Sequence, residues 1–392
     1  MNVVFLTNEY PPNVYGGAGV HVEYLARELA RLCSVQVYPF GDQHIDDTQL
    51  RVRGMPSEGA PQASDPRFNK LFDTLQRNLH MAAAVQEADI VHCHTWYSHW
   101  AGCLVRQLTG ARLVLTTHSL EPHRPWKFEQ LGRAYHASSW IERTAYRSAD
   151  GIVAVSPQMK ADVVDLYEVD PARVTVIPNG IDPDEYRPTF DAEVLRRYGV
   201  DPNRPFVLFV GRITRQKGII HLVHAIKDLI PGTQVVLAAG APDTAEIEEE
   251  MTQEVARLQQ EGRHRIVWIR AMMPRQDLIV LYSHALVFVC PSVYEPFGII
   301  NLEAMACETA VVASDVGGIP MVVKEASTGY LVSPEGDGFP ERLAERINEL
   351  MTNPGRCTEM GQRGRQRVEA QFSWRAVAGQ TLAMYQKMAE SG

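Results

Sequence analysis

The chain has 392 residues, which at about 100–200 residues per domain predicts two or three domains. Apolar residues make up 45% and charged residues 22%, which excludes disorder as the main state. The net charge of −9 argues against a general nucleic-acid binder, because such a protein would carry a basic excess. No apolar run reaches the roughly 20 residues that span a bilayer.

The first residues and the cysteines indicate where the protein works. The opening MNVVFL predicts a β-strand rather than a signal peptide. The six cysteines form no CxxC pair, which is typical of buried free thiols in a reducing compartment. We therefore expect a cytoplasmic protein.

Short apolar runs alternate with helical patterns along the chain. Most of these runs are continuously apolar, as in parallel strands covered by helices on both faces. They lie at 3–7, 35–40, 90–93, 113–117, 151–155, 174–177, 206–210, 235–239, 266–269, 286–290, 310–313 and 330–332. The alternation predicts an α/β fold with two Rossmann-like, doubly wound parallel sheets facing across a cleft.

Proline, glycine and asparagine gather after residue 178, which is typical of a linker. We therefore expect an N-terminal domain over 1–180, a hinge over 181–205 and a C-terminal domain over 206–372. Residues 373–392 predict a last helix, and the sequence leaves open which domain it packs on. The polar stretch 41–65 predicts a long surface loop.

A glycine-rich motif, Gly16-Gly17-Ala18-Gly19, follows the first predicted strand. Glycines let a backbone approach a phosphate or sugar closely, and a helix N-terminus favours an anion. The motif nearly matches the dinucleotide fingerprint, but Val22 stands at its last glycine position. An NAD site and a plain glycine turn are the alternatives.

Histidines stand at two predicted strand ends of the first half. His92 and His94 share one face of a strand, but a metal site needs three ligands and no third is visible. Hydrogen-bonded or site-lining histidines are the better interpretation. His118 ends the next strand, and the basic segment with Arg124 and Lys127 follows it; the alternative for that segment is an exposed loop.

The first strand of the second half ends in the basic stretch 211–218, which contains Arg212 and Lys217. It is no Walker loop, because Gln216 replaces a required glycine and Gly218 a required Ser or Thr. Its cations suit a diphosphate, since arginine grips oxygens in a fork and lysine acts as a point charge. A solvated basic turn is the alternative.

A second strand end in this half carries Glu295 and, eight residues on, Glu303. Glu295 precedes Pro296, which suits the first turn of a helix, so the next backbone N–H groups would point into the cleft. Two solvated surface acids are the alternative. The formal DxD pair Asp182 and Asp184 lies in the proline-rich hinge and indicates a turn.

These motifs resemble glycosyltransferase family 4, the retaining GT-B glycosyltransferases, over essentially the whole chain. The stretches YPPNVYGGAGVH, HSLEPHRPWK, VGRITRQKG and PSVYEPFGIINLEAMA are similar to short actinobacterial-type glycogen synthases. Enzymes of that type use ADP-glucose, and some make α-maltose 1-phosphate from glucose 1-phosphate. The chain departs from elongating synthases, whose Lys-x-Gly-Gly-Leu loop is replaced by Val14-Tyr15-Gly16-Gly17-Ala18.

The resemblance implies a role for each candidate residue singled out in the second half. Arg212 and Lys217 would clamp the diphosphate, Glu295 would orient the donor sugar, and Glu303 would hold the ribose. Backbone N–H groups of Gly298, Ile299 and Ile300 would touch sugar and phosphate. No metal and no cofactor are expected, because the two cations supply the counter-charge for the leaving phosphate.

In the first half, His118 would complete the catalytic set. Gly16 and Gly17 would contact the donor, and His21, Arg124 and Lys127 would lie on the acceptor side. The implied partners are a nucleotide sugar and either glucose 1-phosphate or an α-glucan, with no nucleic acid, and a homo-oligomer stays open.

The rivals are a family-4 enzyme with another donor or acceptor, a nucleotide-sugar epimerase and a silent sugar-binding module. An epimerase needs acid/base carboxylates in the first domain, and the sequence shows no clear pair. The joint presence of Arg212, Lys217, Glu295 and His118 speaks against a silent module.

Overall fold

The computed structural model describes residues 1–390, which form two compact units. Unit 1 comprises Met1–Gly180 and the stretch from Trp374 onward, and unit 2 comprises Ile181–Ser373. The expected hinge, 181–205, is thus counted with unit 2. Its helix α7 (Ala192–Arg197), capped by Asp191, packs on α10 (Arg275–His284).

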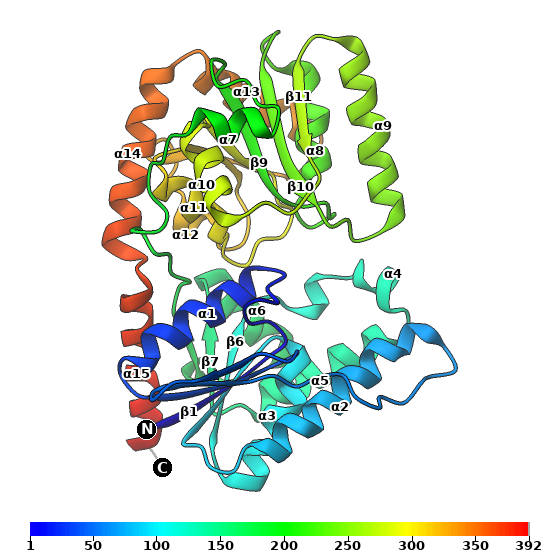
Figure 1. Ribbon diagram of the computed structural model, residues 1–392, viewed down its shortest axis with the longest axis vertical. Coiled ribbons are helices and arrows are strands. Elements are labelled where there is room, and N and C mark those ends of the chain that lie inside the picture. The colour runs from blue at the N-terminus through cyan, green and yellow to red at the C-terminus, as the bar shows by residue number, and fades with distance from the viewer. Residues whose placement is uncertain (391–392) are drawn as a thin grey trace. The chain divides into compact units, whose positions relative to one another are not determined.

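Unit 1 contains an eight-stranded sheet in the order β3-β4-β2-β1-β5-β6-β7-β8. Figure 1 shows this sheet with β1, β6 and β7 labelled. The strands are β1 (Asn2–Thr7), β2 (Ser34–Pro39), β3 (His44–Asp46), β4 (Leu50–Arg53), β5 (Ile90–His94), β6 (Arg112–Thr117), β7 (Gly151–Ala154) and β8 (Val174–Val176). All neighbours are parallel except β3 and β4, which pair antiparallel at the edge. The six strands expected in this half are confirmed.

The expected loop at 41–65 is partly wrong, because it contains β3 and β4. These strands are three and four residues long, and within them only Val52 is buried. Strands this short and exposed give almost no alternating apolar signal in the sequence.

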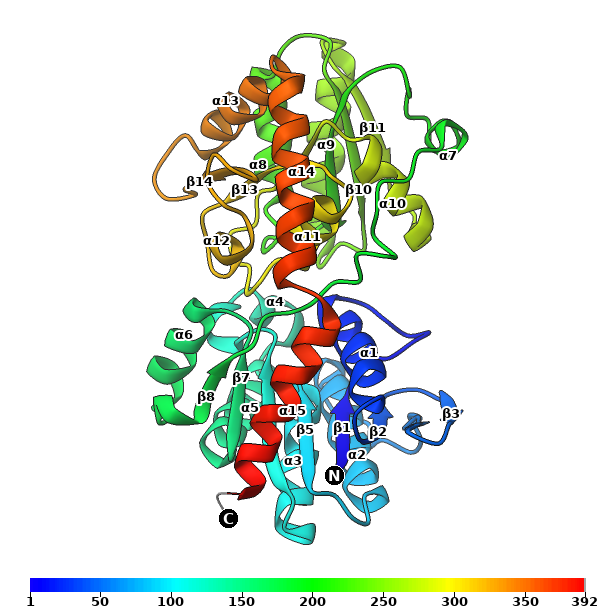
Figure 2. The ribbon, with the colours of Figure 1, turned by 90° about the vertical axis from the view of Figure 1, so that its left-hand side faces the viewer.

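Helices cover both faces of the unit 1 sheet. The helices of this unit are α1 (Gly17–Ala30), α2 (Asn69–Ala84), α3 (Trp96–Thr109), α4 (Lys127–Leu131), α5 (Ala134–Ser148), α6 (Pro157–Tyr167) and α15 (Trp374–Glu390), and of these the short α4 packs on α5. The last helix, α15, lies beside α1 (Figure 2), and Trp374 stacks on Tyr24. The helix whose place the sequence left open therefore packs on unit 1.

Unit 2 contains a six-stranded, all-parallel sheet in the order β11-β10-β9-β12-β13-β14. The strands are β9 (Phe206–Arg212), β10 (Gln234–Gly240), β11 (Arg265–Ile269), β12 (Val287–Cys290), β13 (Ala310–Ser314) and β14 (Gly329–Val332). The other helices are α8 (Ile219–Ala225), α9 (Ala245–Glu261), α11 (Ile299–Ala306), α12 (Ile319–Val322), α13 (Phe339–Met351) and α14 (Pro354–Gln371). All six strands expected in this half are confirmed.

Each sheet has a point at which the strand order reverses, because the chain adds later strands on the opposite side of the first one. In unit 1 this point lies between β1 and β5, and in unit 2 between β9 and β12. Ligands of such sheets bind beyond the carboxyl ends of the strands at this point. The loops after β1, β5, β9 and β12 are therefore where ligands are expected to bind.

No helix among residues 1–390 combines the length and the apolar character that a membrane crossing requires.

Candidate active site

The two loops at the reversal point of unit 2 touch each other. Gly218 has a positive φ of 61°, and a Cβ on it would lie 2.0 Å from the carbonyl oxygen of Pro291. The N–H of Val293 also donates to the carbonyl of Gln216 at 2.9 Å. Only glycine allows this approach, which brings the basic loop after β9 against the acidic loop after β12.

Lys217 and Glu295 meet where these loops touch. Lys217 Nζ lies 2.7 Å from Glu295 Oε2, and Ser292 Oγ donates to the same oxygen at 3.2 Å. The Glu295 residue is only 6% exposed, so it is not a solvated surface acid. The predicted phosphate cation and sugar-orienting carboxylate are thus direct neighbours.

Arg212 ends β9 and is also partnered. Its Nη1 lies 3.0 Å from Oδ1 of Asp243, a residue of the loop after β10. The sequence analysis did not single out Asp243. Its position just beyond a predicted strand end was the signal that could have found it.

The helix after β12 begins later than expected. Gly298, with φ 94°, precedes α11, and Pro296 lies in the loop instead of the first helical turn. The left-handed conformation of Gly298 ends the loop, so helical geometry starts only at Ile299. The N–H groups of Ile299 and Ile300 are in the first turn, where intrahelical partners are lacking.

Glu303 lies one turn further along α11. Its Oε1 accepts from the Tyr186 hydroxyl at 3.1 Å and its Oε2 from the Tyr282 hydroxyl at 2.8 Å. Burial raises the pKa of the Glu303 carboxyl, and the two tyrosine hydrogen bonds oppose that shift. The acid was predicted from the sequence, and the two tyrosines were not.

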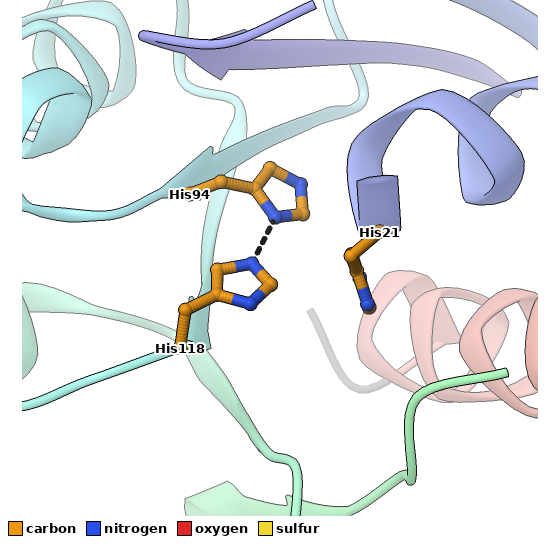
Figure 3. Close-up of side chains that lie close together, drawn as sticks. All are labelled: His21, His94 and His118. Atoms are coloured by element: carbon orange, nitrogen blue, oxygen red, sulfur yellow. Dashed lines mark hydrogen bonds between the residues drawn. The ribbon is translucent and has the colours of Figure 1, made fainter. Parts of the chain in front are cut away.

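The reversal point of unit 1 gathers three histidines (Figure 3). His94 ends β5, His118 follows β6, and His21 lies on α1. His94 Nδ1 lies 3.0 Å from His118 Nε2, and His21 Nδ1 is hydrogen-bonded to Asn179 Oδ1. His118, the predicted catalytic residue, is therefore hydrogen-bonded to a residue of its own unit.

Among the described residues, these three histidines have nitrogens within 4.8 Å of one another and could hold a metal ion. The sequence showed no third ligand, because His21 reaches the other two only through the fold. Burial lowers the pKa of His21 to about 4 and holds that of His94 and His118 well below the usual range, so all three are neutral near pH 7. They are therefore neutral imidazoles, linked in part by hydrogen bonds, and neutral imidazole is also the form that binds a metal ion.

His92, the other histidine of β5, is a structural residue. Its Nε2 lies 2.7 Å from Thr116 Oγ1, and its Nδ1 is bonded to the hydroxyl of Tyr385 on α15. The prediction of a hydrogen-bonded histidine is confirmed here.

The glycine loop before α1 already binds a carboxylate of the same chain. Glu9 Oε2 accepts from the N–H groups of Tyr15 and Gly16, at 2.8 Å each. The Glu9 residue is only 8% exposed. Gly16 is the N-cap of α1 and Gly17 its first residue, so Glu9 fixes the loop that was expected to approach the donor.

The basic segment after His118 is not an exposed loop, because both of its cations lie near a buried acid. Lys127 Nζ lies 3.3 Å from Glu121 Oε1, and Arg124 Nη1 lies 3.8 Å from the same oxygen. Glu121 is 1% exposed and Lys127 7%. The sequence analysis missed Glu121, although its spacing of three and six residues from the two cations was a signal.

Glu121 also contacts a second acid, Glu142 on α5. The N–H of Glu121 donates to Glu142 Oε2 at 2.8 Å, and burial with the nearby Glu121 charge raises the pKa of Glu142 to about 8. Unit 1 thus does contain a carboxylate pair, contrary to the sequence interpretation. Both acids are at most 2% exposed, so they are closed to a substrate.

The turn interpretation of the DxD pair is confirmed. Asp182 Oδ1 accepts from the N–H groups of Asp184 and Glu185, at 2.9 and 3.3 Å. The carboxylate thus closes a local turn.

Comparison with known proteins identifies the family. The model described as Glycosyltransferase Family 4 matches residues 15–185, and the one described as Glycosyl transferases group 1 matches residues 191–367. The chain belongs to the GT-B glycosyltransferases of family 4. It is therefore an enzyme of hexosyltransferase type.

Similar proteins and solved structures match this chain over nearly its full length. The chain is 49% identical to the alpha-maltose-1-phosphate synthase of Mycolicibacterium smegmatis over 99% of its own length and 100% of the relative. The structure of sucrose-phosphate synthase from Thermosynechococcus elongatus matches with a TM-score of 0.81 at 26% identity, over 100% of both chains. Anabaena HepE in complex with UDP-glucose matches with a TM-score of 0.76 at 19% identity, over 99% of this chain and 100% of HepE, a likeness of fold.

Proposed function

We propose that this family-4 enzyme transfers glucose from a nucleotide sugar, ADP-glucose, to glucose 1-phosphate, giving α-maltose 1-phosphate. The contact between Lys217 and Glu295 carries the donor part of this proposal. In a nucleotide sugar, the sugar is bonded directly to a phosphate. A phosphate-binding cation beside a sugar-orienting carboxylate is the arrangement that this junction needs.

The reaction breaks the anomeric C–O bond to the diphosphate and forms a new C–O bond to an acceptor hydroxyl. Negative charge develops on the departing phosphate, where Lys217 and Arg212 stabilise it. The phosphate takes the proton of the acceptor hydroxyl, and attack from the same face retains the α configuration. With these two cations in place, turnover needs no metal ion.

The choice of acceptor rests on the likeness to an alpha-maltose-1-phosphate synthase over the full length. The missing lysine of the elongating synthases' loop also favours a small phosphorylated acceptor over a glucan. Of the two cations proposed for the acceptor phosphate, Arg124 is the better candidate. Its side chain is 15% exposed against 9% for Lys127, and it lies further from Glu121.

One experiment tests donor and acceptor together. ADP-glucose or UDP-glucose is supplied with glucose 1-phosphate, with glycogen or without acceptor, and released nucleoside diphosphate and product mass are measured. We expect ADP release that depends on glucose 1-phosphate and a product with the mass of maltose phosphate. Faster release of nucleoside diphosphate with glycogen would show that the enzyme is a glucan synthase. Equal release without any acceptor would show that it is a hydrolase.

A further inference from the structure

Glu303 is held by two neutral donors instead of a cation. Tyr186 donates to one carboxylate oxygen and Tyr282 to the other, at 3.1 and 2.8 Å. Among residues 1–390, no ion pair within 4.0 Å reaches Glu303. The tyrosines are 7% and 0% exposed, so both hydrogen bonds are shielded from water.

Tyr186 is fixed on unit 2 by its neighbours along the chain. Its N–H donates to the carbonyl of Asp182 at 2.9 Å, and its own carbonyl accepts from Arg365 at 3.2 Å. The adjacent Glu185 lies 2.9 Å from Arg275 at the start of α10. The expected hinge stretch therefore supplies a rigid donor to the predicted ribose acid.

Tyr282 approaches Glu303 from α10. Its ring lies edge-on to Phe288 of β12, with centroids 5.4 Å apart, and its carbonyl accepts from Thr309 Oγ1 at 2.5 Å. Glu303 on α11 thus receives donors from two other segments of unit 2. The carboxylate plane is set by three separate parts of the chain.

Each carboxylate oxygen has two acceptor positions. One tyrosine occupies one position on each oxygen, which leaves one position per oxygen for a ligand. A ribose 2′,3′-diol needs this pair of positions. A carboxylate free to rotate would present them only part of the time, and ordering it would cost binding free energy.

We propose that Tyr186 and Tyr282 are positioning residues that hold the Glu303 carboxylate in the orientation that binds the ribose diol of the donor nucleotide. The inference rests on the proposed role of Glu303 in donor binding. The competing explanation is that the hydroxyls only satisfy a buried carboxylate. That role would affect folding stability but not the recognition of the ribose hydroxyls.

The experiment measures the affinity for ADP and for 2′,3′-dideoxy-ADP by calorimetry. The ratio of the two dissociation constants reports the diol contact alone, because the two ligands share base and diphosphate. The variants are Tyr186→Phe, Tyr282→Phe and Glu303→Gln. The matched control is Tyr330→Phe, which removes the hydroxyl of another buried tyrosine that is bonded to a glutamate, Glu349.

We expect wild type and Tyr330→Phe to prefer ADP, and Glu303→Gln to lose most of this preference. Each of the other two tyrosine variants should reduce the preference about threefold to tenfold, the range for the net contribution of a typical hydrogen bond. In turnover assays, the same two variants should raise the donor KM by a similar factor and leave kcat nearly unchanged.

The unfavourable outcomes separate the two ideas. If wild type binds both nucleotides equally, Glu303 does not bind the ribose diol, and the positioning role of the two tyrosines is wrong as well. If wild type prefers ADP but both tyrosine variants keep the full preference, only the positioning role is wrong. Should one variant fail to fold, the other still decides, because each hydroxyl serves a different oxygen.

Discussion

Lys217 Nζ lies 2.7 Å from Glu295 Oε2, although the two residues are 78 positions apart in the chain. The contact joins the loop after β9 to the loop after β12. It places the cation proposed for the leaving phosphate next to the carboxylate proposed for the sugar, within one unit of the protein.

Removing either cation should slow the chemical step. We expect Lys217→Ala or Arg212→Ala to lower kcat about a hundredfold or more, the usual effect of losing one electrostatic stabiliser of a transition state. Lys227→Ala is the matched control, because Lys227 lies in the same unit and its side chain is 49% exposed. Steady-state kinetics with ADP-glucose and glucose 1-phosphate measures this, and a change confined to KM would contradict the proposed role.

The two cations of the acceptor segment should differ in effect. We expect Arg124→Ala to raise the KM for glucose 1-phosphate about tenfold, since a charge-assisted contact contributes about 1.5–3 kcal/mol. Lys127→Ala should chiefly destabilise the fold, because truncating a buried ion pair costs about 3–5 kcal/mol. Melting temperatures and acceptor kinetics, with glycogen as the comparison acceptor, separate the two effects. Full selectivity for the phosphorylated sugar in Arg124→Ala would rule out the acceptor role.

Turnover should be independent of divalent metal. We expect activity to be unchanged after treatment with EDTA and removal of the chelator, because Arg212 and Lys217 supply the counter-charge in the proposed mechanism. The rate should stay the same on adding magnesium or manganese. A loss of activity that either metal restores would show that the cations are not sufficient.

The buried histidines should make the protein sensitive to acid. Burial lowers the pKa of His21 to about 4 and that of His99 to about 3. The unfolded chain binds these protons below about pH 6.5 and the folded chain does not, so the free energy of unfolding falls as the pH drops from about 6.5 towards about 4. Denaturant unfolding at several pH values measures the slope.

His99→Leu should reduce this slope. Both nitrogens of His99 are buried without a hydrogen-bond partner among the described residues, so leucine removes a titrating group and no such bond. His44→Leu, at an exposed position of β3, is the control. An identical slope in wild type and His99→Leu would show that this histidine does not drive the acid sensitivity.

The local sequence determined the buried strands of both sheets and the residues at their ends. Strands buried on both faces leave continuous apolar runs, and strand ends of a doubly wound sheet carry the site. Arg212, Lys217, Glu295, Glu303 and His118 could therefore be named from the sequence. The short strands β3 and β4 could not, because their residues are largely exposed.

The partners of these residues were decided only by the tertiary structure. Asp243 beside Arg212, Tyr186 beside Glu303 and His21 beside His94 are 31 to 117 positions apart in the chain. Their contacts depend on strand order and helix packing, which no local pattern encodes. Lys127 illustrates the consequence. In the sequence it is a cation free for a phosphate, and in the fold burial has already paired it with Glu121, because a charge removed from water requires a counter-charge.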